Sequence, residues 1–318
     1  MPLTTKAQVP NINSYYSRNL LLRVQPRLLH ALFGQIRDLP RNNSDVIKFR
    51  RYTELSNATT PLTEGITPVG NQLSVTTITA TIQQYGDFIV STDMVDFTTE
   101  DPIMLETAQL LGDQAGRTID AIIAQTLSTG TNVIYAAARV SRATIQAGDI
   151  LTEGLIISAE ELLKISNTLT ITKFADPDEA YNTVPLPDCF VGIVHTYTTR
   201  TLRAMSGFTK VELYAQNPTT RMPGEIGKIQ TTRFLETTAA VVFAGAGVAG
   251  IDFYSTIIFG QEAFGISRIS GEAMEVITTE PGGNSDPLKQ RWTMGWKATL
   301  AVKILNDNFI VRIEHARV

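Results

Sequence analysis

Ser74–Gly86 reads SVTTITATIQQYG, a run in which β-branched side chains predominate. Such residues favour extended strands, and here Ile78, Ala80 and Ile82 fall on one face while threonines fall on the other. At about 3.3 Å per residue, Leu73–Tyr85 would reach about 43 Å. A compact domain of this length has a radius of gyration of only about 20 Å. The strand is therefore expected to cross the whole body or to project from it.

A second predicted strand lies just upstream, in DVIKFRRYTEL at residues 45–55. Ile47 and Phe49 alternate there with Lys48 and Arg50, which is a strand pattern. Between the two strands come 17 residues rich in Thr, Pro and Gly, SNATTPLTEGITPVGNQ. Together the segments predict a long hairpin. A loop of this length without structure of its own suits a compact domain poorly, so we expect another subunit to order it.

The clearest helix is predicted over Asp101–Ser128. Asp101 can cap it, Pro102 suits its first position and Gly130 can end it. Apolar residues recur three or four positions apart along one face: Met104, Ala108, Leu111, Ala115, Ile119 and Ile122. A helix of this length spans about 40 Å. It is expected to serve as a structural spine.

The rest of the chain predicts one more helix and many short strands. A second helix is expected to start at Ser158, where Ser158 and Glu161 form a capping-box pattern. CFVGIV, KIQTTRFLE, AAVVFA and FYSTIIFG each read as a strand. Alternating apolar residues on both sides of the sequence NDN then predict a C-terminal hairpin: Leu300, Val302 and Ile304 before it, and Phe309, Val311 and Ile313 after it.

Composition narrows the class of protein. Apolar residues make up 43% of the 318 residues and charged residues only 18%, which indicates a large core and a surface partly buried against other copies. The lone Cys189, in an apolar run, favours a buried thiol and a reducing compartment. The N-terminus lacks the apolar core of a signal peptide. The longest apolar stretch, Ala239–Ile251, falls short of the ~20 residues that span a bilayer, so no membrane protein is expected.

Charge is distributed unevenly along the chain. Residues 1–51 carry nine Lys or Arg and two acidic residues, a net charge of +7, and the remainder carries −11. A basic arm before an acidic body suits contact with an acidic neighbour or with a polyanion. A solvated basic terminus remains the alternative interpretation.

Motifs for chemistry are weak. Gly245, Gly247 and Gly250 match the G-x-G-x-x-G spacing of dinucleotide sites, but the β-branched IDFYSTIIFG follows in place of a helix. Cys189 and His195 have no recognisable orienting residue beside them, which disfavours a thiol nucleophile. The three histidines have no partners at metal-ligand spacing. We therefore assign no catalytic, cofactor-binding or metal-binding residues and expect no enzyme activity and no cofactor.

Six blocks of sequence, in order, resemble a known family. They are LLLRVQPRLLHALFGQIRDLPRNNSDVIKFRRY, PLTEGITPVG, TATIQQYGDFIVSTDMVD, LLGDQAGRTIDAII, GEIGKIQTTRFLET and DPLKQRWTMGWKATLAVKILND. The chain is similar, from about Leu20 to Arg312, to tailed-bacteriophage major capsid (coat) proteins, in the group founded by podophage N-four. Several blocks in the same order are more specific than any single motif in this sequence.

The resemblance implies an α+β protein with the Hong-Kong-97-type major capsid fold. The expected parts are an N-terminal arm (1–44), an extended β-hairpin loop (45–91), a peripheral domain with a long spine helix (92–185), an axial domain (186–285) and a C-terminal hairpin returning to the peripheral domain (286–318). In that layout the threonine-rich strand is one side of a loop laid over a neighbouring subunit.

The resemblance also implies function and partners. The chain is expected to form pentamers and hexamers of an icosahedral phage head around double-stranded DNA, assembled in the bacterial cytoplasm, with portal, scaffolding and cement or decoration proteins as further partners. Because Lys48, the only lysine of the loop, lies at its base, a shell without covalent cross-links is expected. A cellular nanocompartment shell and a dinucleotide-binding oxidoreductase remain the alternatives. The expected interface residues are Arg18, Arg23, Arg27, Lys48, Arg50, Arg51, Pro61, Leu62, Glu64, Thr77, Thr79 and Thr81.

Overall fold

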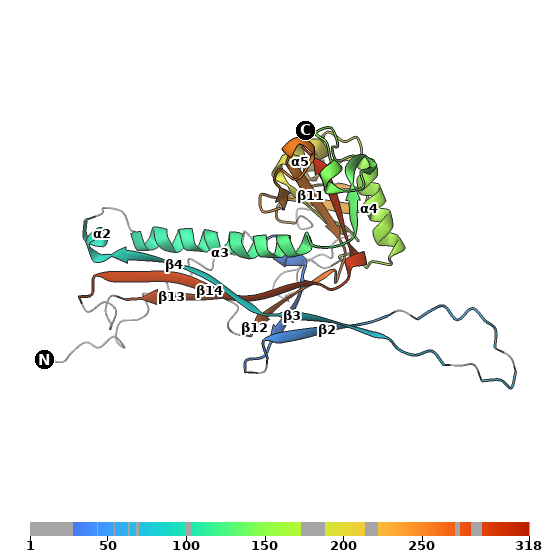
Figure 1. Ribbon diagram of the computed structural model, residues 1–318, viewed down its shortest axis with the longest axis horizontal. Coiled ribbons are helices and arrows are strands. Elements are labelled where there is room, and N and C mark those ends of the chain that lie inside the picture. The colour runs from blue at the N-terminus through green and yellow to red at the C-terminus, as the bar shows by residue number, and fades with distance from the viewer. Residues whose placement is uncertain are drawn as a thin grey trace.

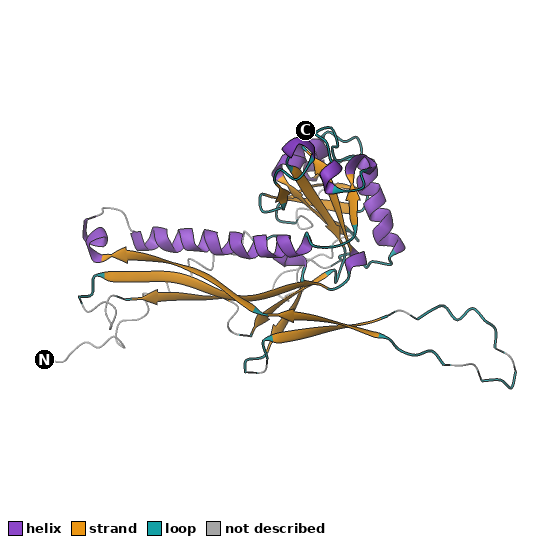
Figure 2. Ribbon diagram, viewed as in Figure 1, coloured by secondary structure: helices purple, strands orange, loops and turns teal. Residues whose placement is uncertain are grey.

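The computed structural model describes residues 28–42, 44–53, 55–62, 64–67, 70–98, 103–172, 188–213, 222–270, 274–280 and 288–317. It has three parts: a flat arm of sheet and helix, a globular part at one end of that arm, and a hairpin that projects beyond the body (Figure 1). Helices and strands are mixed throughout (Figure 2), which confirms the predicted α+β class.

The flat arm is built on a five-stranded sheet, called here the long sheet. Its strands follow the order β1 (Gln35–Leu39), β12 (Phe264–Ile269), β14 (Arg291–Ile304) and β13 (Met274–Thr279), with β4 (Gln83–Thr92) paired to β14. β4 and β14 pair antiparallel from Gln83↔Leu300 to Thr92↔Arg291. The short helix α2 (Asp93–Thr98) follows β4 at the far end of the arm (Figure 1).

The predicted spine helix is α3 (Ile103–Leu127), which lies along the long sheet (Figure 1). Its buried Ala108, Leu111 and Ala115 pack against Trp292 and Trp296 of β14. The helix prediction is confirmed, and Asp101 and Pro102 lie outside the described residues. Since every second residue of β14 faces the helix, this packing fixes the orientation of the long sheet.

The globular part is built on an eight-stranded sheet, called here the globular sheet. Seven strands follow the order β5 (Val133–Tyr135), β15 (Ile310–Ala316), β11 (Phe253–Phe259), β6 (Phe190–His195), β9 (Thr232–Thr237), β8 (Glu225–Ile229) and β7 (Thr209–Lys210), and β10 (Val242–Phe243) pairs with β11. The helices α4 (Glu153–Ile165) and α5 (Thr196–Arg203) belong to this part. Short 3-10 turns occupy His30–Phe33, Ala136–Ala138, Arg142–Thr144, Val211–Leu213, Val248–Gly250 and Asp307–Phe309.

The start predicted for the second helix is wrong. α4 begins at Glu153, with Thr152 at the N-cap position, so Ser158 lies inside the helix. The buried Ile156, together with residues further along α4, packs in a cluster with the globular sheet. Because of this packing, the helix begins about one and a half turns N-terminal to Ser158.

Two strand predictions also need correction. KIQTTRFLE is not one strand: β8 ends at Ile229 and β9 begins at Thr232, and the two pair as a hairpin whose turn has Gln230 at φ 49°. The C-terminal strands β14 and β15 exist as predicted but form no hairpin with each other. β14 pairs with β4, β12 and β13, while β15 lies between β5 and β11. The two strands therefore belong to different sheets.

The same pairing shows which sheet each segment of the expected domains joins. Residues 83–91, expected in the extended loop, lie in β4 of the long sheet. β12 and β13, expected in the axial domain, also belong to the long sheet, whereas α4, expected in the peripheral domain, packs on the globular sheet. The chain crosses between the two sheets several times, so each sheet is assembled from separate segments of the chain.

Candidate subunit interface

The projecting hairpin consists of β2 (Val46–Tyr52) and β3 (Val75–Thr81), paired antiparallel from Val46↔Thr81 to Tyr52↔Val75. Arg50 faces Thr77 and Lys48 faces Thr79 across the pair. These polar side chains therefore share one exposed face, as the alternation in the sequence predicted. Two backbone hydrogen bonds, from Ile82 N to Asp45 O (2.9 Å) and from Thr53 N to Ser74 O (3.0 Å), extend the hairpin at its two ends.

The other face of the hairpin holds it to the long sheet. Ala80 is buried, and Ile47, Phe49 and Ile78 are half-buried. The Phe49 ring packs on Gly265 of β12 so closely that a Cβ at Gly265 would lie 2.9 Å from Phe49 Cζ. A glycine at this position therefore provides the space that the ring occupies, and the base of the hairpin is fixed to the body.

Beyond the paired strands, the loop extends away from the body (Figure 1). Every residue described between 55 and 74 is exposed, including Pro61, Leu62 and Glu64 of the predicted interface. Leu62 is 79% exposed, Ile66 67% and Leu73 65%. Exposed apolar side chains in such a row are typical of a surface that another molecule covers.

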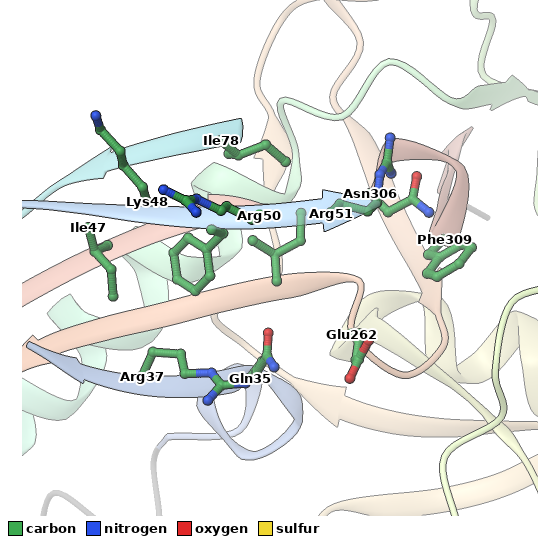
Figure 3. Close-up of a pocket in the computed structure, with 12 residues that line it drawn as sticks. Gln35, Arg37, Ile47, Lys48, Arg50, Arg51, Ile78, Glu262, Asn306 and Phe309 are labelled. Carbon is green, nitrogen blue, oxygen red and sulfur yellow. The ribbon is translucent and has the colours of Figure 1, made fainter. Parts of the chain in front are cut away.

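A groove of about 450 Å³ lies between the base of the hairpin and the body (Figure 3). Arg37 from β1 faces β2 across it, and Ile47 points into it from β2, whereas Lys48 projects from the opposite side of the strand (Figure 3). Its lining residues are Gln35, Arg37, Ile47, Lys48, Phe49, Arg50, Arg51, Ile78, Glu262, Leu305, Asn306 and Phe309. The structure thus brings together the predicted Lys48, Arg50 and Arg51, and adds Arg37 and Glu262, which the sequence analysis missed.

The remaining predicted interface residues divide into two groups. Thr77, Thr79 and Thr81 are exposed on β3. Arg18, Arg23 and Arg27 lie outside the described residues. The sequence of β1 gave no signal for Arg37, since Ile36, Arg37 and Asp38 are all exposed, and only the tertiary fold places Arg37 beside β2.

The glycine motif has no dinucleotide geometry. Gly245, Gly247 and Gly250 lie in the loop between the antiparallel β10 and β11, with Gly245 at φ 64° and Gly250 at φ 75°. The Gly247 amide donates to Ile251 O at 3.0 Å and the Gly245 amide to Asp252 Oδ1 at 2.8 Å. A phosphate site needs free amides at the N-terminus of a following helix, so this loop does not fit one.

Each histidine has a structural contact. His30 N and Nδ1 both lie 2.8 Å from the Asp120 carboxylate of α3, and both residues are buried. His195 Nδ1 accepts from Tyr197 N at the start of α5, and burial lowers the pKa of His195. His315 donates from Nδ1 to Ala316 O, and burial lowers its pKa to about 4. Among the described residues, no cluster of three or more His, Cys, Asp or Glu could hold a metal ion.

Cys189 is buried just before β6 of the globular sheet, with Sγ 3.5 Å from Ile171 O. Burial raises the pKa of this thiol to about 11. At pH 8 roughly one thiol in a thousand is then ionised, and we expect maleimide to label native Cys189 at least about 100-fold more slowly than the chain unfolded in urea. Mass spectrometry of timed samples measures both rates. Equal rates would contradict the buried position.

In the described residues, no helix is long and apolar enough to span a membrane. The profile of the phage capsid protein family matches residues 75–313. The chain belongs to the phage capsid protein family. This capsid protein has the expected Hong-Kong-97-type fold. The resemblance to tailed-phage major capsid proteins is confirmed.

Solved capsid structures resemble this capsid protein over nearly its whole length. The capsid of Ralstonia phage GP4 shares 15% identity at a TM-score of 0.70, covering 90% of this chain and 87% of that one. The cyanophage Pam1 capsid shares 15% at 0.63, with coverage of 100% and 96%. The head of Helicobacter pylori bacteriophage KHP40 shares 11% at 0.60, with coverage of 100% and 95%. No curated protein sequence matches the chain.

Proposed function

We propose that this capsid protein assembles as pentamers and hexamers into an icosahedral head that encloses double-stranded DNA. The observation that carries this proposal is the projecting hairpin, whose exposed Leu62, Ile66 and Leu73 gain burial only when another molecule covers them. Many such contacts per shell add up, because each subunit both offers a hairpin and receives one. The role is structural and needs no catalysis.

In this assembly the long sheet with α3 forms the peripheral domain and the globular sheet forms the axial domain. Closed rings of axial domains make the capsomers, since a rotation that closes gives a finite oligomer. Lys48 lies in β2, paired with Thr79, and not at the tip of the loop. The shell is therefore held by non-covalent contacts. Portal, scaffolding and cement or decoration proteins are the further partners, and assembly takes place in the cytoplasm of the bacterial host.

Electron microscopy of the purified product tests this function. We expect closed, uniform particles that contain nuclease-protected DNA when they are isolated from phage. DNA inside separates a phage head from a cellular nanocompartment. A product that stays monomeric under all solution conditions would contradict the proposal.

A further inference from the structure

The groove at the base of the hairpin combines an apolar wall with positively charged side chains. Ile47, Phe49 and Ile78 supply the wall. Four cationic residues also line the groove: Arg37, Lys48, Arg50 and Arg51. Their side chains make no ion pair or hydrogen bond with any residue that the structure describes. Glu262 is the acidic residue of the lining. The groove therefore fits a segment that carries both acidic and apolar side chains.

The basic residues of the groove precede a long acidic stretch in the sequence. Residues 52–116 contain no Lys, Arg or His and nine acidic residues: Glu54, Glu64, Asp87, Asp93, Asp96, Glu100, Asp101, Glu106 and Asp113. This stretch runs from the hairpin loop through β4 and α2 into the first half of α3. The cations of the groove therefore come from the basic first 51 residues, and the far end of the arm comes from the acidic stretch.

The segment with the required chemistry is α2. Its Met94 is 63% exposed and its Val95 41%, and Asp93 and Asp96 lie in the same helix. β14 begins beside it, so Arg291 offsets part of the negative charge. α2 lies at the far end of the arm from β2, so it cannot reach the groove of its own chain (Figure 1).

We propose that the groove binds α2 of a second copy of this chain, with Met94 and Val95 against the apolar wall and the acidic residues of α2 beside Arg37 and Arg51, which lies on the same face of β2 as Ile47 and Phe49. This contact is head-to-tail, since two different surfaces meet, and such contacts form a ring when the rotation between copies closes. It rests on the proposed shell function and names one pair of surfaces within it. Charge complementarity of this kind fixes register and is weakened by salt.

Cross-linking between introduced thiols tests the contact. Because Cys189 is buried with a raised pKa, cysteines at Arg37→Cys and Met94→Cys are the reactive thiols of the double variant. We expect a short bis-maleimide to convert assembled particles of this variant into a ladder of covalent multimers on a denaturing gel. The matched control is Lys210→Cys with Met94→Cys, because Lys210 is exposed on the globular sheet away from the groove. The control should stay monomeric.

Charge reversal tests the same contact independently. It can be used even if the cysteine variant assembles poorly. Arg37→Glu with Arg51→Glu should reduce the yield of particles about tenfold, and adding Asp96→Lys should recover most of it. Lys210→Glu with Arg203→Glu has the same change in charge and should assemble normally. Particles that form normally without a ladder, or protection of the Arg37→Cys thiol without a link to Met94→Cys, would overturn the proposal. Failure of the unmodified chain to form particles would instead overturn the proposed function.

Discussion

Deletion of residues 57–70 should leave a folded subunit that no longer closes shells. The described residues of this segment are exposed, so its removal takes away no core contact of its own chain. β2 and β3 keep their seven paired positions, and Phe49 keeps its place on Gly265. What the variant loses is the apolar surface around Leu62 and Ile66 that a neighbour would cover.

Two measurements separate folding from assembly in this variant. Circular dichroism and thermal melting of unassembled subunits should match the unmodified chain closely, whereas electron microscopy should show at least about tenfold fewer closed particles. A Gly/Ser segment of the same length is the matched control, since it preserves reach and removes side chains. We expect it to fail as well. Normal particles from either variant would mean that the loop does not hold the shell.

Glu314→Ala should be among the most destabilising single substitutions in this chain. Glu314 lies fully buried in β15, between β5 and β11, with Oε1 2.8 Å from Arg142 Nη2 and 2.8 Å from Arg312 Nε. Burial lowers the pKa of Arg312, and the charge of Glu314 opposes that shift. Without the carboxylate, Arg312 stays buried and uncompensated, which costs about 4 kcal/mol of unfolding free energy.

That loss is a large share of the 5–15 kcal/mol of unfolding free energy typical of a domain. Urea denaturation of unassembled subunits measures it. Glu275→Ala is the control, because Glu275 also forms an ion pair, with Lys297 at 3.2 Å, but the side chain of Glu275 is exposed and that of Lys297 is half-buried. The control should change the unfolding free energy by less than about 1 kcal/mol. Equal effects of the two substitutions would contradict the role of burial.

Some elements could be predicted from the sequence because they depend on neighbours in the chain. The hairpin of β2 and β3 and the helix α3 follow from patterns of period two and of period three to four, and both were confirmed. The start of α4 was wrong, since packing of Ile156 against the globular sheet overrides the capping pattern at Ser158. The basic residues 48–51 were found as a charge run, but the groove was not, because Arg37 reaches it through the pairing of β1 with β12.

The sequence by itself determined that this protein has a long two-faced hairpin, a spine helix and a basic N-terminal part. It also determined which family the protein resembles. The hairpin and the helix follow from the spacing of apolar side chains along the chain, and the family follows from blocks of residues in a fixed order. Only the tertiary structure decided which strands share a sheet, that β14 and β15 separate into two sheets, and that Arg37 of β1 and Arg51 of β2 line one groove. Strand pairing joins residues more than 200 positions apart, and the free energy of that pairing depends on which edges are still unpaired, which no local pattern records.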